Sequence, residues 1–245
     1  MNLKTRKLTL IAVLSAIIFV MGISPLGFIP LGVLNITTMH IPVIVAGILE
    51  GPLVGGLVGF IFGLFSMFNA IVRPNPLSFI FLNPLVSVGP RILIGVFTAY
   101  VYRIFKNKDD NRLKIIMNLF WGLISLFMVY MVYRSFNESA STANKIFSIL
   151  FLILALLMLY LSIRYRRKDF ALAISAFVGT LTNSGLVLTL IYLIYADKYV
   201  MALGISRDLA AKVIFSAFVT NGIPEAIIAI MISSSVVYSI LKRRR

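Results

Sequence analysis

Residues 81–96 read Phe81-Leu-Asn-Pro-Leu-Val-Ser-Val-Gly-Pro-Arg-Ile-Leu-Ile-Gly-Val96, and they open a long apolar segment. Three polar side chains interrupt it at intervals of four residues, at Asn83, Ser87 and Arg91. On one continuous helix, this spacing places all three on the same face. A charged residue well inside a membrane segment costs about 2.5–3.5 kcal/mol and normally faces a protein interior or a watery cavity. We therefore expect this face to line a small-molecule site.

The composition around this segment indicates a membrane protein. Of the 245 residues, 60% are hydrophobic and only 13% are charged, whereas soluble domains are about 45–50% apolar and about 25% charged. Apolar runs of about twenty residues recur along the whole chain, and they are continuous rather than alternating, which favours membrane helices over a β-barrel. We expect an all-α, polytopic protein whose residues 1–245 form a single membrane domain.

Basic residues set the expected topology. The net charge is +15, but sixteen of the 23 Lys and Arg residues lie in four short clusters, at residues 4–7, 103–114, 164–168 and 242–245. Alternation of such clusters with apolar runs follows the positive-inside rule, so we expect both termini in the cytoplasm and no nucleic-acid partner. The eight helices predicted on this basis cover about residues 8–22, 36–49, 53–72, 82–102, 113–133, 146–163, 170–195 and 210–241, with outer loops at 23–35 and 196–209.

These predicted helices differ in character. The third carries Gly55, Gly59 and Gly63 at intervals of four residues, a spacing that allows close helix approach. The fifth and sixth are rich in Leu, Ile, Phe and Met, and we expect them to face lipid without contributing buried polar groups.

Polar residues reappear in the last two predicted helices. Asn183 lies mid-segment, and Asn221-Gly-Ile-Pro-Glu225 places an amide and a carboxylate one turn apart. Pro224 removes a helix hydrogen bond and frees a carbonyl near the same level. Interhelical hydrogen bonding would explain each Asn alone, and an ion pair with Glu225 would explain Arg91. Their joint presence favours one common polar cavity.

Two further features have both a structural and a functional interpretation. Ala12-Val-Leu-Ser-Ala16 is a pair of small residues one helical turn apart, which suits either internal packing or docking of another subunit. His40, with Thr37 and Thr38 at the expected start of the second helix, is either a hydrogen-bonded interior residue or a substrate contact.

Several chemistries lack the residues they need. The chain has no cysteine, and its His, Asp and Glu residues show no metal-ligand spacing. It has no phosphate-binding loop of the Walker type and no evident Ser/His/Asp arrangement. We expect no metal or cofactor in this chain and no enzyme activity.

Motifs in a fixed order along the chain resemble those of one transporter family. The motifs are Ala12-x-x-x-Ala16, Ile36-Thr-Thr-Met-His-Ile-Pro-Val43, Glu50-Gly-Pro, Phe62-Gly-Leu-Phe-Ser66, Asn83-Pro with Pro90-Arg91, Thr180-Leu-Thr-Asn183 and Asn221-Gly-Ile-Pro-Glu225. Together they are similar to the substrate-binding S component of energy-coupling factor (ECF) vitamin transporters, and most like the pantothenate-specific subfamily.

The resemblance implies a fold and a set of partners. An S component has six helices, lies in the bacterial cell membrane and binds a small vitamin near the outer surface. It works with a transmembrane coupling subunit (EcfT-type) and two ATP-binding cassette ATPases, which use ATP, and it meets the coupling subunit through the small-residue face of its first helix. By resemblance, Ala12 and Ala16 take that role here. Residues 5–105 and 170–241 then form the family core, and 106–169 form an inserted transmembrane hairpin.

The resemblance also implies a cargo, which we expect to be pantothenate. Its carboxylate suits Arg91, and its hydroxyl and amide groups suit asparagine side chains. The remaining alternatives are an S component for another vitamin such as a B6 vitamer, an autonomous ion-coupled transporter, and a membrane enzyme that uses Glu225 or His40. The expected substrate-binding residues are Arg91, Asn83, Ser87, Asn183, Asn221, Glu225, Thr37 and His40.

Overall fold

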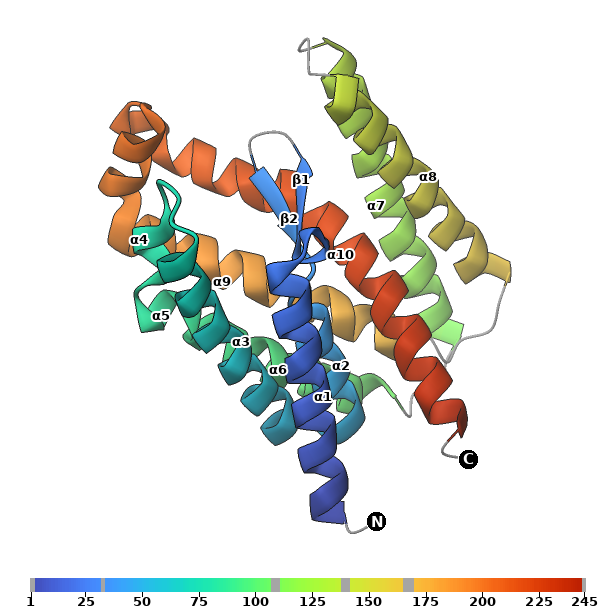
Figure 1. Ribbon diagram of the computed structural model, residues 1–245. Coiled ribbons are helices and arrows are strands. Elements are labelled where there is room, and N and C mark those ends of the chain that lie inside the picture. Colours follow the sequence, from blue (N-terminus) through green and yellow to red (C-terminus); the bar gives the residue numbers. More distant parts are fainter. Residues whose placement is uncertain (1–2, 32–33, 107–110, 138–141, 165–169, 244–245) are drawn as a thin grey trace.

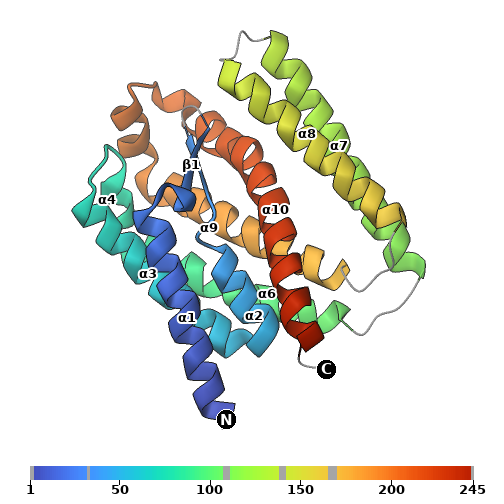
Figure 2. The same cartoon turned by 45° about the vertical axis from the view of Figure 1, so that its right-hand side comes forward.

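The protein is a bundle of membrane-length helices (Figures 1 and 2). The computed structural model describes residues 3–31, 34–106, 111–137, 142–164 and 170–243. Its elements are α1 (Leu3–Ile23), η1 (Pro25–Gly27), β1 (Phe28–Leu31), β2 (Leu34–Thr37), α2 (Ile41–Glu50), α3 (Pro52–Val72), α4 (Ser78–Phe81), α5 (Pro84–Ser87), α6 (Gly89–Phe105), α7 (Asn111–Asn137), α8 (Thr142–Arg164), α9 (Phe170–Leu203), η2 (Arg207–Leu209) and α10 (Ala210–Arg243).

The polytopic all-α class predicted from the sequence is confirmed. Within the described residues, six helices are long and apolar enough to cross a membrane: α1, α3, α5–α6, α7, α9 and α10. The number of full spans is smaller than the eight expected. Helix α2 has ten residues and is about 15 Å long, half the thickness of the hydrocarbon core. The Lys145–Tyr160 part of α8 is a second shorter apolar helix.

Two groups of helices are visible in Figures 1 and 2. Helices α1, α2, α3, α6, α9 and α10 form the main body, and α7 and α8 form an antiparallel hairpin that leans against it on the α10 side. The beginning of α1 and the end of α10 lie at one end of the molecule, and the β1–β2 hairpin and α4 lie toward the other. Both described chain ends therefore lie on the same side of the bundle, as the predicted topology requires.

The segment expected to be an outer loop, residues 23–35, contains a short β-hairpin. Strands β1 and β2 pair antiparallel, with Phe28 opposite Thr37 and Leu31 opposite Leu34. Thr38 continues the hairpin, because its N–H donates to the carbonyl of Gly27 at 3.2 Å. This pairing satisfies backbone groups that the Pro-containing segment cannot place in a helix. The following helix consequently begins at Ile41 rather than at residue 36.

The helix expected over residues 82–102 is broken into short pieces before α6. Asn83 lies between α4 and α5 and caps α5, since its Oδ1 accepts the N–H of Leu85 at 2.9 Å. Pro84 occupies the first turn of α5 and Pro90 the first turn of α6, positions where a missing N–H costs nothing. The prediction that Asn83, Ser87 and Arg91 share one helical face is therefore wrong.

The late helices also run further than expected. Helix α9 continues to Leu203, so the first half of the outer loop predicted at 196–209 is helical. Arg207 Nε lies 2.7 Å from Asp197 Oδ1 and joins the end of α9 to η2. Helix α10 continues across Pro224 to Arg243 and changes direction along its length, as Figure 1 shows.

Close packing through glycine, predicted for the third helix, is confirmed. A Cβ atom built on Gly55 of α3 would lie 2.8 Å from the Cα of Gly47 and 2.9 Å from the Cα of Gly95. Helices α2, α3 and α6 therefore meet backbone to backbone at this level. Further along α3, a Cβ on Gly63 would lie 2.6 Å from the Cα of Val88. This contact places the start of α6 directly against α3.

The α7–α8 hairpin is partly as predicted. Its outer face exposes large apolar side chains, including Leu119, Leu123 and Leu126. Its inner face buries Trp121 and packs Phe120 edge-on against Phe177 of α9, with ring centroids 4.7 Å apart. The expectation of no buried polar groups is wrong, because Ser125, Ser148 and Ser162 are buried. The hydroxyl of Ser162 donates to Asn118 Oδ1 at 2.7 Å, a contact that holds the two helices together.

Candidate functional site

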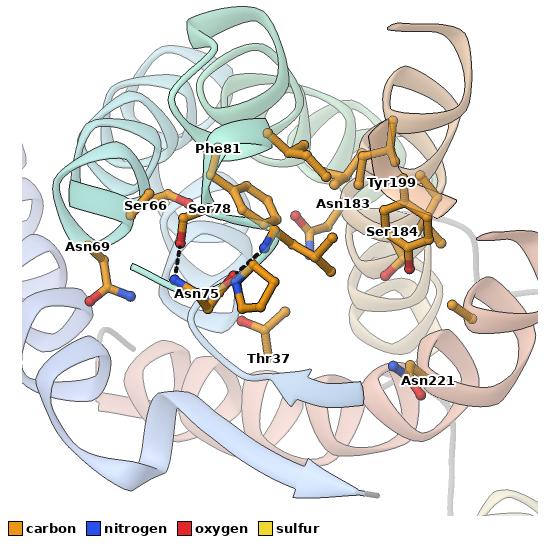
Figure 3. A pocket seen from close by; sticks show the side chains of 18 of the residues that line it. Thr37, Ser66, Asn69, Asn75, Ser78, Phe81, Asn183, Ser184, Tyr199 and Asn221 are labelled. Atoms are coloured by element: carbon orange, nitrogen blue, oxygen red, sulfur yellow. Dashed lines mark hydrogen bonds between the residues drawn. The ribbon is translucent and has the colours of Figure 1, made fainter. Parts of the chain in front are cut away.

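A cavity of about 500 Å³ lies where β2, α3, α4, α6, α9 and α10 converge. Figure 3 shows Ser66 and Asn69 reaching it from α3, Asn183 and Ser184 from α9, Asn221 from α10 and Thr37 from β2. Phe62, Phe81 and Tyr199 add aromatic surface. The polar members of the lining are Thr37, Ser66, Asn69, Arg73, Asn75, Ser78, Arg91, Asn183, Ser184, Tyr199, Asn221 and Glu225.

Arg91 brings a buried positive charge to this cavity. It lies in the first turn of α6 and is only 6% exposed. Its Nη1 donates to the carbonyl of Val86 at 2.7 Å, and its guanidinium carbon lies 5.4 Å from the ring centre of Phe62 and 5.7 Å from that of Phe81. Nε has no hydrogen-bond partner among the described residues. Aromatic faces stabilise a cation, but they leave most of its five N–H donors available.

Glu225 brings a buried negative charge to the same cavity. Its carboxylate is 4% exposed. Oε1 accepts the backbone N–H of Thr37 at 2.8 Å, and Oε2 accepts the hydroxyl of Ser184 at 2.9 Å. These bonds tie the end of β2, α9 and α10 together. Among the described residues, no ion pair within 4.0 Å joins Glu225 to Arg91, so the structural ion pair considered from the sequence is absent from this part of the chain.

Two asparagines complete the polar lining that was expected. Asn183 is 4% exposed, and its Oδ1 has no partner among the described residues. Asn221 lies partly exposed on α10, with its Oδ1 3.5 Å from the hydroxyl of Thr220. An unpaired buried amide oxygen costs free energy unless a ligand or water satisfies it. Asn183 therefore marks a position where a hydrogen-bond donor would be stabilised.

Three of the expected site residues lie outside this lining. The Nδ2 of Asn83 donates to the hydroxyl of Tyr195 at 3.1 Å, and Ser87 is fully buried with its hydroxyl donating to the carbonyl of Phe81. His40 is also fully buried, and its Nε2 lies 3.0 Å from the hydroxyl of Thr180. These contacts hold the chain around the cavity, and their contribution to binding stays a prediction.

Comparison with known proteins identifies the family. A sequence model described as "ECF transporter, substrate-specific component" matches residues 6–150. The chain belongs to this family. Its membership confirms the resemblance seen in the sequence motifs and assigns the protein a transport role.

Curated relatives carry consistent names. The S component is 26% identical over 210 residues to the pantothenic acid transporter PanT of Lactococcus lactis subsp. cremoris. The aligned region covers 85% of this chain and 79% of that protein. It is 30% identical over 132 residues to the pantothenate transporter PanT of Leuconostoc mesenteroides subsp. mesenteroides. This aligned region covers 51% of this chain and 65% of that protein.

Sequence reasoning missed part of the S component's lining. Ser66, Asn69 and Arg73 follow one another at intervals of three and four residues at the end of α3, which is the signal of one helical face. Tyr199 was assigned to an outer loop, and only the extension of α9 brings it to the cavity. Ser184 directly follows Asn183 and was overlooked.

The small-residue face of α1 in this S component is open. Ala12 and Ala16 are both exposed, whereas Ser15 and Ile18 on the neighbouring face of the helix are buried. Internal packing therefore does not explain the two alanines.

No group of three or more His, Asp or Glu residues in the described part of the chain could hold a metal ion.

Proposed function

We propose that this S component captures pantothenate from outside the cell for ATP-driven import. The observation that carries the proposal is Arg91, a buried guanidinium that lines the cavity with no carboxylate of the described residues within 4.0 Å. A carboxylate would supply the missing charge and could accept two parallel hydrogen bonds from the guanidinium fork. The names of the two curated relatives support the same cargo.

The remainder of the cavity suits the rest of this vitamin. Pantothenate carries two hydroxyl groups and an amide, and the lining offers Asn183, Asn221, Ser184 and Tyr199 for hydrogen bonding. Phe62 offers apolar surface for its methyl groups. The volume of about 500 Å³ lies within the range of about 300–1,000 Å³ usual for small-molecule sites. A mostly apolar wall with a few polar groups is typical of such pockets.

Import requires partners that we infer from the family. The proposed assembly contains a membrane-embedded coupling subunit and two ATPases that hydrolyse ATP, and the S component itself acts as a binder rather than an enzyme. Exposure of Ala12 and Ala16 supports α1 as the docking helix, because small residues let a partner helix approach closely. The proposed orientation in the bacterial cell membrane has both termini in the cytoplasm, in keeping with the four basic clusters.

Native mass spectrometry and calorimetry on the purified full-length protein test the cargo. We expect pantothenate to co-purify with it and to bind the ligand-free protein, with pyridoxine and other neutral B6 vitamers giving no heat. Binding of a B6 vitamer with no response to pantothenate would move the protein to another vitamin. Uptake by cells that lack the coupling subunit and its ATPases would instead indicate an autonomous transporter.

A further inference from the structure

The cavity holds two buried charges of opposite sign that do not pair with each other. Arg91 and Glu225 both line it, at 6% and 4% exposure, and no ion pair within 4.0 Å joins them in the part of the chain that the structure describes. Each charge instead has neutral partners. Arg91 donates to a backbone carbonyl and lies over two aromatic rings, and Glu225 accepts from one backbone N–H and one hydroxyl.

Glu225 retains unused acceptor capacity. A carboxylate has about four lone-pair positions, and the structure fills two of them, with Thr37 on Oε1 and Ser184 on Oε2. Both donors are uncharged, and no basic side chain among the described residues lies within 4.0 Å of the carboxylate. Asn183 adds a second acceptor, because its buried Oδ1 has no partner among those residues.

The cavity is therefore polarised. Donors are concentrated at Arg91, where Nε is unpartnered among the described residues, and acceptors are offered by Glu225 and Asn183. A ligand that combines an anionic group with separate hydrogen-bond donors, such as hydroxyl groups, satisfies this arrangement. A second carboxylate on the ligand would face Glu225 and be repelled. The cavity would then reject dicarboxylates through this unfavourable contact rather than through a better fit to monocarboxylates.

We propose that Glu225 is a specificity-determining residue that accepts a hydrogen bond from a ligand hydroxyl and excludes ligands with a second anionic group. This inference rests on the proposed function, because it takes a hydroxylated monocarboxylic acid as the ligand. The carboxylate also binds Thr37 at the end of β2. Glu225 thus holds the β-hairpin beside the cavity while it selects the ligand.

Calorimetry with two ligands and two forms of the protein shows whether Glu225 binds a ligand hydroxyl or only holds the β1–β2 hairpin in place. The ligands are pantothenate and the N-acyl-β-alanine of the same carbon skeleton without the two hydroxyls. The variant is Glu225→Gln, which keeps the shape and an acceptor oxygen for Thr37 but loses charge and acceptor capacity. Losing a hydroxyl bonded to a charged acceptor should weaken binding to the wild type by about tenfold or more. In Glu225→Gln, the same deletion should cost at most about threefold.

The control is Arg91→Gln, which should weaken both ligands by the same factor because both carry the carboxylate. If removing the hydroxyls costs the same factor in wild type and Glu225→Gln, Glu225 holds the hairpin only and the inference is overturned. If the wild type binds neither ligand, the proposed function fails as well.

A ligand-only measurement keeps the inference testable even if Glu225→Gln does not fold. The probe is the pantothenate analogue whose terminal CH₂OH is oxidised to a carboxylate, offered to the wild-type protein. We expect its binding to be at least about a hundredfold weaker than that of pantothenate, because the added charge meets Glu225 and an uncompensated buried charge is costly. Equal affinity for the two compounds would overturn the inference without any substitution.

Discussion

Gly59 of α3 lies directly against the carbonyl group of Arg91 in α6. A Cβ atom on this glycine would clash with the carbonyl carbon and oxygen of the arginine and would lie 3.1 Å from the Cα of Ile92. The absence of a side chain on α3 therefore determines how close the first turn of α6 can come. Through that turn, it determines where the guanidinium lies in the cavity.

Gly59→Ala should displace Arg91, weaken pantothenate binding and lower the unfolding temperature, since forcing a methyl group into a packed helix contact costs on the order of 1–3 kcal/mol of folding stability. Gly56→Ala is the matched control on the same helix. Its Cβ would meet Val96 and Ile92 at ordinary distances of 3.6 and 3.7 Å, so affinity should be retained. Calorimetry on both variants checks this, and equal behaviour of the two would refute the positional argument.

Arg91→Lys keeps the charge and removes the guanidinium fork, whereas Arg91→Gln removes both. Loss of a buried, charge-assisted contact costs on the order of 2–5 kcal/mol, so Gln should weaken pantothenate binding by about thirtyfold or more, with Lys between Gln and wild type. Lys198→Gln is the control and should retain affinity, because Lys198 is an exposed basic residue outside the cavity lining. Calorimetry should include the neutral alcohol analogue of the vitamin. Equal loss of affinity for the acid and the alcohol on Arg91→Gln would mean that Arg91 holds the helices and not the carboxylate.

The double change Ala12→Leu with Ala16→Leu should abolish uptake in cells and leave binding to the purified protein unchanged. Both positions are exposed, so larger side chains disturb a partner helix rather than the fold. Ala12→Ser with Ala16→Ser keeps the residues small and should retain uptake. Radiolabelled vitamin uptake and calorimetry are measured side by side. Loss of binding, or normal uptake by the Leu variant, would contradict the docking role.

Joining Phe105 to Lys168 with a short polar linker removes the α7–α8 hairpin and should preserve cargo affinity, because α7 and α8 contribute no residue to the cavity lining that the structure describes. Thermal stability should fall, since Phe177 loses its contact with Phe120. Trp121→Ala tests the same interface without deletion and should lower the unfolding temperature with no change in affinity. A spliced protein that folds but fails to bind would assign the hairpin to the site.

Single cysteines can test the membrane orientation, because the chain has none of its own. Thr5→Cys and Pro74→Cys occupy exposed positions near the start of α1 and just beyond α3. A membrane-impermeant maleimide added to intact cells or spheroplasts should label Pro74→Cys and not Thr5→Cys, and permeabilised cells should label both. The reverse pattern would invert the proposed topology.

The features that could be predicted from the sequence are those that each segment determines on its own. Apolar runs, basic clusters and the glycine spacing of α3 depend only on how each segment meets lipid, water or a neighbouring helix, so they predicted the all-α membrane class and the close packing of Gly55 and Gly59. The same rules failed between residues 78 and 90. In this segment, Asn83 caps the four-residue helix α5. Its spacing of eight residues from Arg91 matched that of one helical face, although no continuous helix joins the two residues.

The amino-acid sequence by itself determined which segments enter the membrane and that Arg91 and Glu225 are buried with them, because a bilayer selects for length and hydrophobicity one segment at a time. The sequence also favoured one common cavity for these two charges, but only the tertiary structure decided that they line it without forming an ion pair. The bond from the Thr37 N–H to Glu225 joins residues 188 positions apart. Such a contact depends on how the broken helix before α6, the β1–β2 hairpin and the bent α10 pack together. The spacing of residues along the chain does not predict this packing.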